Sequence, residues 1–281
     1  MRKCSEKMTV QYGFTLIELI SVIVLLSVLA VGSVQFISFS AQGYVDTARR
    51  GELASSASVM NEKISRKVRD ALPGSVRINS DGSCLEFIPV IGATEYTQAP
   101  VVGNPEPQTE VRTVPIDGAL SNSGYLAVYP VTGNVNDLYN NTRNPGRISS
   151  AVASVSASAS GADIYTFSGG ASFQFEQGSP TRRIFITSSP SAFCQQGNKV
   201  YFYKNYGFVG DISNLAAALP ATVPNRVIIS DAVQAGSLSF QYIPASLRRN
   251  ALVSYEVNFI DVQDPSESLA VNQEVQIRNV P

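Results

Sequence analysis

The chain has 281 residues, enough for one large domain or two modest ones, and its 21 basic and 22 acidic residues give a formal net charge of −1. Such a balance provides no field that would gather DNA or anionic lipid. The chain has no histidine, which excludes Ser-His-Asp and Cys-His catalysis and histidine metal sites. Catalysis by carboxylates, lysine or tyrosine remains an alternative, but the sequence shows no paired carboxylates, so we expect neither an enzyme nor a cofactor.

Residues 1–13 are basic and precede a long apolar run. Three basic residues stand against one acid before Gly13, and Leu19–Val45 carries no charge at all. A bilayer span needs about 20 apolar residues, so this run is long enough to cross a membrane. The basic flank predicts an N-terminus in the cytoplasm and a C-terminal domain in the periplasm.

Two ordinary explanations leave part of this run unexplained. A secretory signal has an apolar region of about 7–15 residues that ends at a small-residue cleavage site, whereas this run is longer and no convincing site follows Ser40. A plain signal anchor explains the length but not Glu18, which lies at the start of the apolar stretch. A carboxylate in a membrane is costly, so we expect Glu18 to have a partner or a task.

The sequence GFTLIE at residues 13–18, followed by an apolar helix, resembles the N-terminal signal of type IV pilins and type II secretion pseudopilins. The resemblance covers residues 8–45. It implies that a prepilin peptidase cuts between Gly13 and Phe14 and methylates the new amine, so that residues 1–13 are a leader. It also implies three partners besides the peptidase: other major and minor pilins, an inner-membrane assembly platform, and the inner membrane before assembly.

Glu18 has two interpretations. In a bundle of parallel helices its carboxylate can meet the Phe14 ammonium of a neighbouring subunit, which makes both charges less costly and fixes the axial register. Alternatively, Glu18 merely lies near a helix N-terminus, where the helix dipole favours a carboxylate. We expect the first role, assembly, for Glu18 and assign processing to Gly13 and Phe14.

One long helix is expected from Phe14 to Leu72, because no proline occurs before Pro73. Major pilins commonly have a proline within the apolar half, and its absence here predicts an unbroken helix. Beyond the membrane run, apolar residues recur at steps of three and four: Leu53, Ala57, Met60, Ile64, Val68 and Ala71. Residues 14–45 are therefore the membrane and assembly half, and 46–72 an amphipathic half, unless the second half is only a linker helix.

Residues 73–281 have the pattern of a β-rich periplasmic domain. Segments rich in β-branched and aromatic residues alternate with Gly, Pro and Asn clusters. The expected strands are Ser75–Asn79, Cys84–Ile88, Val111–Ile116, Tyr125–Tyr129, Asp163–Phe167, Ser172–Phe175, Arg183–Thr187, Lys199–Lys204, Val227–Ser230, Leu238–Ile243, Val253–Phe259 and Val271–Ile277. With the N-terminal helix they predict an α+β, pilin-like fold: a long helix packed on an antiparallel sheet, with extra β-rich elaboration.

Three segments stand apart from this pattern. Residues 92–162 read as an elaboration on a smaller pilin core. Within them, Ser149–Gly161 is almost entirely Ser, Ala and Val, and we expect an insertion or a mobile loop there. Ile212–Leu219 is expected to form one or two helical turns.

The cysteines indicate an oxidised domain. Cys4 lies in the leader, which leaves Cys84 and Cys194 in a segment exported to an oxidising space. We expect them to form a disulfide; two buried thiols are the alternative.

Shorter sequence segments indicate which subfamily the chain resembles. Residues 69–78, 84–87, 181–185 and 193–194 are similar to MshO-type minor pilins of the mannose-sensitive haemagglutinin pilus, while residues 275–279 resemble the last strand of J-type pseudopilins. The first resemblance implies a low-abundance subunit that primes assembly or caps the tip. A secretion pseudopilin and a tip adhesin on the same scaffold remain the alternatives.

Two other patterns favour ordinary structure over a ligand site. Asp261, Asp264 and Glu267 cluster near a proline, but their spacing matches no calcium loop, so we expect a solvated turn and no metal. Lys199–Tyr206 mixes bases and aromatics, which can stack on single-stranded nucleic acid. Its alternation is that of an ordinary strand, and we expect no nucleic acid partner.

Overall fold

The computed structural model describes residues 13–103, 106–116, 124–159, 161–245, 249–262 and 264–277. Residues 1–12, including Cys4, lie outside them, as do the last two residues of the segment 275–279. The molecule divides into two units, Met1–Gly51 and Glu52–Pro281. The chain enters the second unit through helix α1 (Leu16–Arg69).

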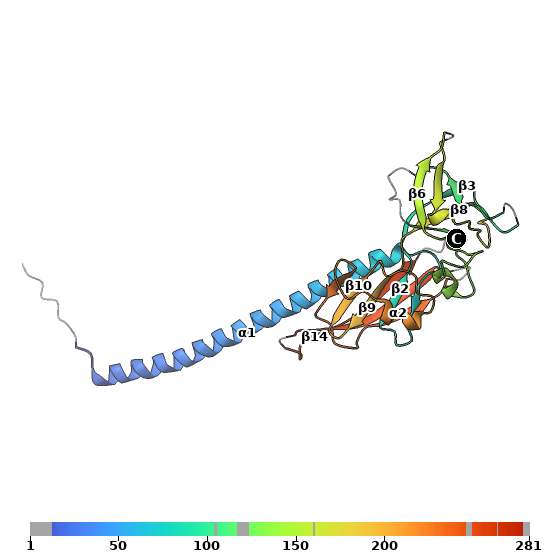
Figure 1. Cartoon of the computed structure of the whole chain (residues 1–281). Helices are drawn as coiled ribbons and strands as arrows, with labels where there is room; N and C mark the ends of the chain where they lie inside the picture. The colour runs from blue at the N-terminus through green and yellow to red at the C-terminus, as the bar shows by residue number, and fades with distance from the viewer. Residues whose placement is uncertain are drawn as a thin grey trace, which may run out of the picture. The chain divides into compact units, whose positions relative to one another are not determined.

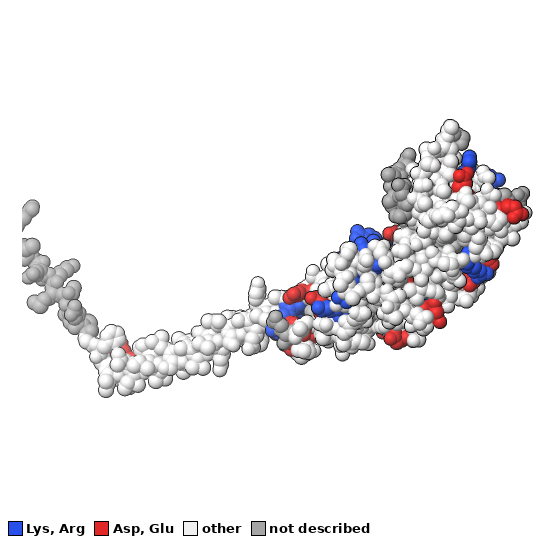
Figure 2. All heavy atoms as spheres, in the orientation of Figure 1, with Lys and Arg blue, Asp and Glu red and all other residues white. Residues whose placement is uncertain are grey.

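Helix α1 is unbroken, as the absence of proline predicted. In the first unit its large apolar side chains are exposed, and Figure 2 shows an almost uncharged surface over this stretch. In the second unit one face is buried: Leu53, Ala57, Met60, Ile64 and Val68. The three-and-four spacing singled out these residues and also Ala71, which lies beyond the helix end at Arg69 but is buried in the same core cluster.

Two antiparallel sheets pack with this buried face around the main core. The five-stranded sheet has the order β1-β2-β9-β10-β11, and the three-stranded sheet the order β12-β13-β14. The strands of the first are β1 (Arg77–Ile78), β2 (Cys84–Phe87), β9 (Ser191–Gln196), β10 (Lys199–Tyr203) and β11 (Arg226–Ser230). Those of the second are β12 (Ser239–Ile243), β13 (Ala251–Ile260) and β14 (Ser268–Ile277). Side chains from both sheets join the helix in one hydrophobic cluster, so the expected α+β, pilin-like architecture is confirmed.

A second β-structure is inserted between two neighbouring strands of this fold. Strands β2 and β9 are paired, with Phe87 opposite Ser191, yet residues 88–190 lie between them in the chain. We call residues 88–190 the inserted module. Its six-stranded antiparallel sheet has the order β5-β8-β3-β4-β7-β6, and Figure 1 shows β3, β6 and β8 gathered together, apart from β2, β9 and β10.

The inserted module has a core of its own. Its strands are β3 (Val90–Gln98), β4 (Glu110–Thr113), β5 (Tyr125–Val128), β6 (Val152–Ala157), β7 (Asp163–Phe167) and β8 (Arg183–Thr187). One cluster of buried side chains belongs to the module alone. Another joins Leu72 to the module residues Ile88, Leu138 and Tyr139, and so forms the junction with the pilin-like part. The elaboration expected at 92–162 is therefore larger than predicted.

The sequence-based strand assignment was wrong in three places. Ser149–Gly161 lies within the inserted module, in line with the insertion alternative, but it is not a mobile loop: it contains β6, which pairs with β7 although serine and alanine have little β preference. Ser172–Phe175 is not a strand: Phe173 and Phe175 form only isolated bridges, and their alternation reflects two rings packed in the core, 5.1 Å apart. Strands β3 and β9 were not expected at all.

The short helices complete the fold. Helical turns η3 (Ile212–Asn214) and α2 (Leu215–Ala218) occupy the segment where one or two turns were expected. Two further turns, η1 (Val135–Tyr139) and η2 (Ser168–Gly170), lie in the inserted module. Leu215 covers the face of the five-stranded sheet that carries the two cysteines.

Candidate functional site

The start of α1 brings the predicted processing and assembly residues into one short segment. Gly13, Phe14 and Thr15 precede the helix, and the Phe14 side chain is 80% exposed. A Cβ on Gly13 would meet no atom within 4 Å among the described residues, so the fold itself places no demand on glycine there. The bond between Gly13 and Phe14 thus lies in exposed, non-helical backbone.

Thr15 caps the helix. Its hydroxyl accepts a hydrogen bond from the backbone N–H of Glu18 at 3.3 Å, and the two residues have the Thr-x-x-Glu spacing of a capping box. Glu18 therefore lies in the first turn, where the helix dipole favours a carboxylate. Both interpretations of Glu18 fit this position, because the hydrogen bond to Thr15 uses the backbone N–H of Glu18, and its side chain is exposed.

The stretch that follows is suited to a membrane. Among the described residues, α1 is the one helix long and apolar enough to cross a bilayer. Two serine hydroxyls in this stretch donate to carbonyls of the preceding turn: Ser21 to Glu18 at 2.9 Å and Ser27 to Ile23 at 2.7 Å. Their polar groups are therefore satisfied inside the helix, which fits single-pass anchoring.

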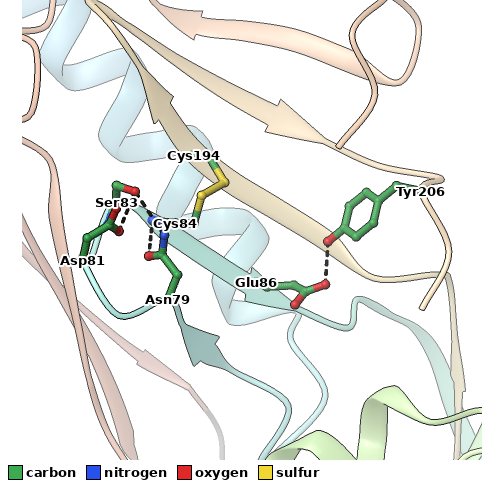
Figure 3. The surroundings of a disulfide bond; sticks show 7 residues. All are labelled: Asn79, Asp81, Ser83, Cys84, Glu86, Cys194 and Tyr206. Atoms are coloured by element: carbon green, nitrogen blue, oxygen red, sulfur yellow. Dashed lines mark hydrogen bonds between the residues drawn. A yellow bond between two sulfur atoms is a disulfide. The ribbon is translucent and has the colours of Figure 1, made fainter. Parts of the chain in front are cut away.

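Cys84 and Cys194 lie opposite each other on β2 and β9 and form a disulfide (Figure 3). A tight turn before β2 positions Cys84. Asp81 accepts hydrogen bonds from the backbone and hydroxyl of Ser83, which lower the pKa of its carboxyl, and Asn79 accepts one from the Cys84 N–H at 2.8 Å. The disulfide between Cys84 and Cys194 closes a loop of the chain that contains the whole inserted module.

A buried ion pair that was not predicted from the sequence lies next to this turn, with one partner before it and the other after it in the chain. Arg77 on β1 and Glu86 on β2 are opposite one another, and Arg77 Nε donates to Glu86 Oε2 at 2.7 Å. Both side chains are almost entirely buried, at 3% and 0% exposure. The Tyr206 hydroxyl donates to the other oxygen of Glu86 at 2.9 Å, as Figure 3 shows.

The remaining donors of Arg77 reach two other parts of the second unit. One nitrogen bonds to Asn136 Oδ1 of the inserted module and to the Gly210 carbonyl, and another bonds to the Val209 carbonyl. The guanidinium also lies 3.5 Å from the centre of the Tyr139 ring. Arg77 therefore links the pilin-like sheet, the inserted module and the loop after β10.

The electrostatics of this cluster follow from its burial. Loss of water raises the pKa of the Glu86 carboxyl, an effect that the Arg77 charge and the hydrogen bonds from Arg77 and Tyr206 oppose. Burial, and then the nearby Glu86 charge, raise the pKa of the Tyr206 and Tyr139 hydroxyls well above 10.0. A buried, fully hydrogen-bonded ion pair of this kind indicates a structural role, which is to hold the inserted module against the pilin-like sheet.

The acidic cluster at Asp261, Asp264 and Glu267 was the one calcium candidate in the sequence. Within the part of the chain that the structure describes, no group of three His, Cys, Asp or Glu side chains is placed to hold a metal ion, and Asp264 instead accepts a hydrogen bond from Ser266 at 2.6 Å. Lys199–Tyr203 forms β10, as the alternation predicted.

Comparison with known proteins gives one finding. Residues 8–34 match the model of the prokaryotic N-terminal methylation motif. The curated proteins gave no match, nor did the solved structures. The matched segment contains Gly13, Phe14 and Glu18 and the start of the apolar helix, and its motif implies processing by a prepilin peptidase and assembly with other pilins. The motif and the fold together support a type IV pilin or pseudopilin precursor.

Proposed function

We propose that this chain is a minor pilin of a type IV pilus, a low-abundance subunit that primes assembly or lies at the fibre tip. The methylation motif at the start of α1 carries the proposal. The inner membrane holds residues 14–45 before assembly, and the domain beyond residue 72 is periplasmic. The protein has no catalytic role in this account.

The proposed steps use the residues at the start of α1. The peptidase cuts after Gly13, and the new amine of Phe14 is methylated, which leaves its positive charge in place. Glu18 of one subunit then pairs with the Phe14 amine of the next as the helix leaves the platform for the fibre. Pairing lowers the cost of both charges in an apolar surrounding and sets the axial position of the subunit.

The inserted module supports the minor role. Residues 88–190 add a six-stranded sheet to the pilin-like part. In a repeating shaft every subunit would have to accommodate such a module beside its neighbours, whereas a tip subunit has fewer neighbours to clash with. The principal alternative is a J-like minor pseudopilin of a type II secretion system, which would use the same anchor and motif.

Fibre composition tests the proposal. In fibres sheared from cells, we expect this chain at a small fraction of the major pilin, and we expect its gene's deletion to lower the number of fibres. Loss of secreted enzymes with normal surface fibres would instead identify the secretion pseudopilin. Equal amounts of this chain and the major subunit would contradict the minor role.

The separate core of the inserted module favours a second candidate, a tip adhesin. Because β2 and β9 are already paired, a short turn can replace residues 88–190. An adhesin predicts that cells with this deletion keep their fibres but lose attachment. Retained attachment by fibres that contain the shortened chain would exclude this role for the module.

A further inference from the structure

Strand β11 forms an outer edge of the five-stranded sheet. It pairs with β10 on one side, and among the described strands none pairs with its other side. Outside that pairing, the described backbone supplies no hydrogen-bond partner to Val227, Ile228 or Ile229. An edge of this kind presents a row of N–H and C=O groups to which another strand can pair.

The edge is unusually apolar. Val227 is 41% exposed and Ile228 49%, and Val223, shortly before the strand, is 77% exposed. Because successive side chains of a strand point to opposite faces, Val227 and Ile228 expose apolar surface on both sides of the sheet. Monomeric proteins usually protect such edges with lysine, proline or a covering segment. Within β11 only Arg226, its first residue, is charged.

Positive charge flanks this apolar edge. Arg226 lies over the Tyr201 ring at 4.7 Å on one face of the sheet, and Lys67 of α1 lies over the Phe202 ring at 5.6 Å on the other. Lys199 and Lys204 bracket the neighbouring strand β10. In the described residues none of these four cations forms an ion pair with a carboxylate.

We propose that the β11 edge binds an extended, acidic-flanked segment of another protein, which adds as a further strand beside β11. Backbone hydrogen bonds supply the pairing, apolar side chains of the segment cover Val227 and Ile228, and its flanking carboxylates meet the cations around β10 and β11. The identification of the partner as another subunit of the fibre rests on the proposed function. The binding chemistry of the β11 edge is independent of that function.

A second copy of this chain fits the edge less well. Pairing two β11 edges would place the four cations of one copy beside the four of the other, with Asp231 the acidic residue that directly follows the strand. Like charges brought together at an interface are unfavourable. The partner segment should therefore carry negative charge.

The test uses a synthetic probe and the full chain in detergent. A short fluorescent peptide that alternates valine and threonine between pairs of glutamates is titrated with the protein, and binding is followed by fluorescence anisotropy. We expect saturable binding that weakens by about tenfold or more when alternate peptide nitrogens are methylated, because strand pairing is then lost. Replacing the glutamates by lysines should weaken binding to a similar degree.

A matched pair of variants locates the binding. Ile228→Lys places a charge on the edge and should weaken binding by about tenfold or more, whereas Val131→Lys, at a similarly exposed valine in the inserted module, should have no effect. Equal binding of the methylated peptide, equal binding by Ile228→Lys, or self-association that Ile228→Lys abolishes would each overturn the proposal. If the chain binds the peptide but never enters fibres, the β11 edge is still a strand-binding site, but its partner is not a subunit of the fibre.

Discussion

Glu18 lies in the first turn of α1 and shares a capping arrangement with Thr15. Glutamine also suits the last position of a capping box, so Glu18→Gln removes the charge while it keeps the helix start. We expect this variant to be cleaved normally but to be absent from sheared fibres. Glu52→Gln, at an exposed position of the same helix, is the control and should assemble. Normal incorporation of Glu18→Gln would show that the carboxylate serves only the helix.

Arg77 and Glu86 form the buried pair at the module junction. Arg77→Met leaves the Glu86 charge buried without its partner, which costs about 3–5 kcal/mol of unfolding free energy. The double variant Arg77→Met/Glu86→Met removes both charges and should lose less. Urea unfolding in detergent, followed by near-ultraviolet circular dichroism, measures both. A single-variant cost of about 1 kcal/mol or less, typical of an exposed pair, would contradict the buried joint.

The sequence itself indicates this buried pair, through the residues that flank Arg77 and Glu86. Arg77 stands between Val76 and Ile78, and Glu86 between Leu85 and Phe87. A single charge inside a short apolar strand is costly unless it is paired, so opposite charges in two successive strands indicate a buried partner. The contacts to Asn136 and the loop after β10 carried no such signal, because they join segments far apart in the chain.

At the scale of elements, regular patterns predicted the structure and irregular ones did not. The unbroken α1 and the alternating strand β13 followed from periodicity, and both are confirmed. Strand β6 was missed because its serines and alanines have little β preference, and β9 because Phe193 is the one residue in it with a strong β preference. The pairing of β2 with β9 across the inserted module depends on long-range contacts, which no local pattern reveals.

The disulfide between β2 and β9 closes a loop of 110 residues. In the chain-entropy model, removing it costs up to about 4–5 kcal/mol, because the unfolded chain then gains freedom. We expect Cys84→Ala/Cys194→Ala to unfold at a correspondingly lower urea concentration, and reductant to shift the parent protein to the same midpoint. If the double variant and the reduced parent both unfold at the midpoint of the oxidised protein, the bond contributes nothing to stability.

At the scale of the whole molecule, several buried tyrosines set a limit on stability in alkali. Burial raises the pKa of Tyr139, Tyr206 and Tyr255 above 10.0 in the folded protein. These hydroxyls therefore ionise first in the unfolded chain, and the stability that they provide is full below pH 10 and falls as the pH rises further. We expect the melting temperature to decrease above pH 10. Tyr255→Phe should flatten this dependence; an unchanged slope would show that Tyr255 does not contribute.

The methylation motif connects these scales, because residues 8–34 join the predicted cleavage point to the exposed apolar helix that leads into the β-rich domain. The intact mass of the membrane-extracted protein, from cells with and without the prepilin peptidase, tests that connection most directly. Our account predicts that residues 1–13 are lost and one methyl group is gained on Phe14, only when the peptidase is present. A full-length, unmethylated chain in both strains would contradict it and leave a simple membrane-anchored domain.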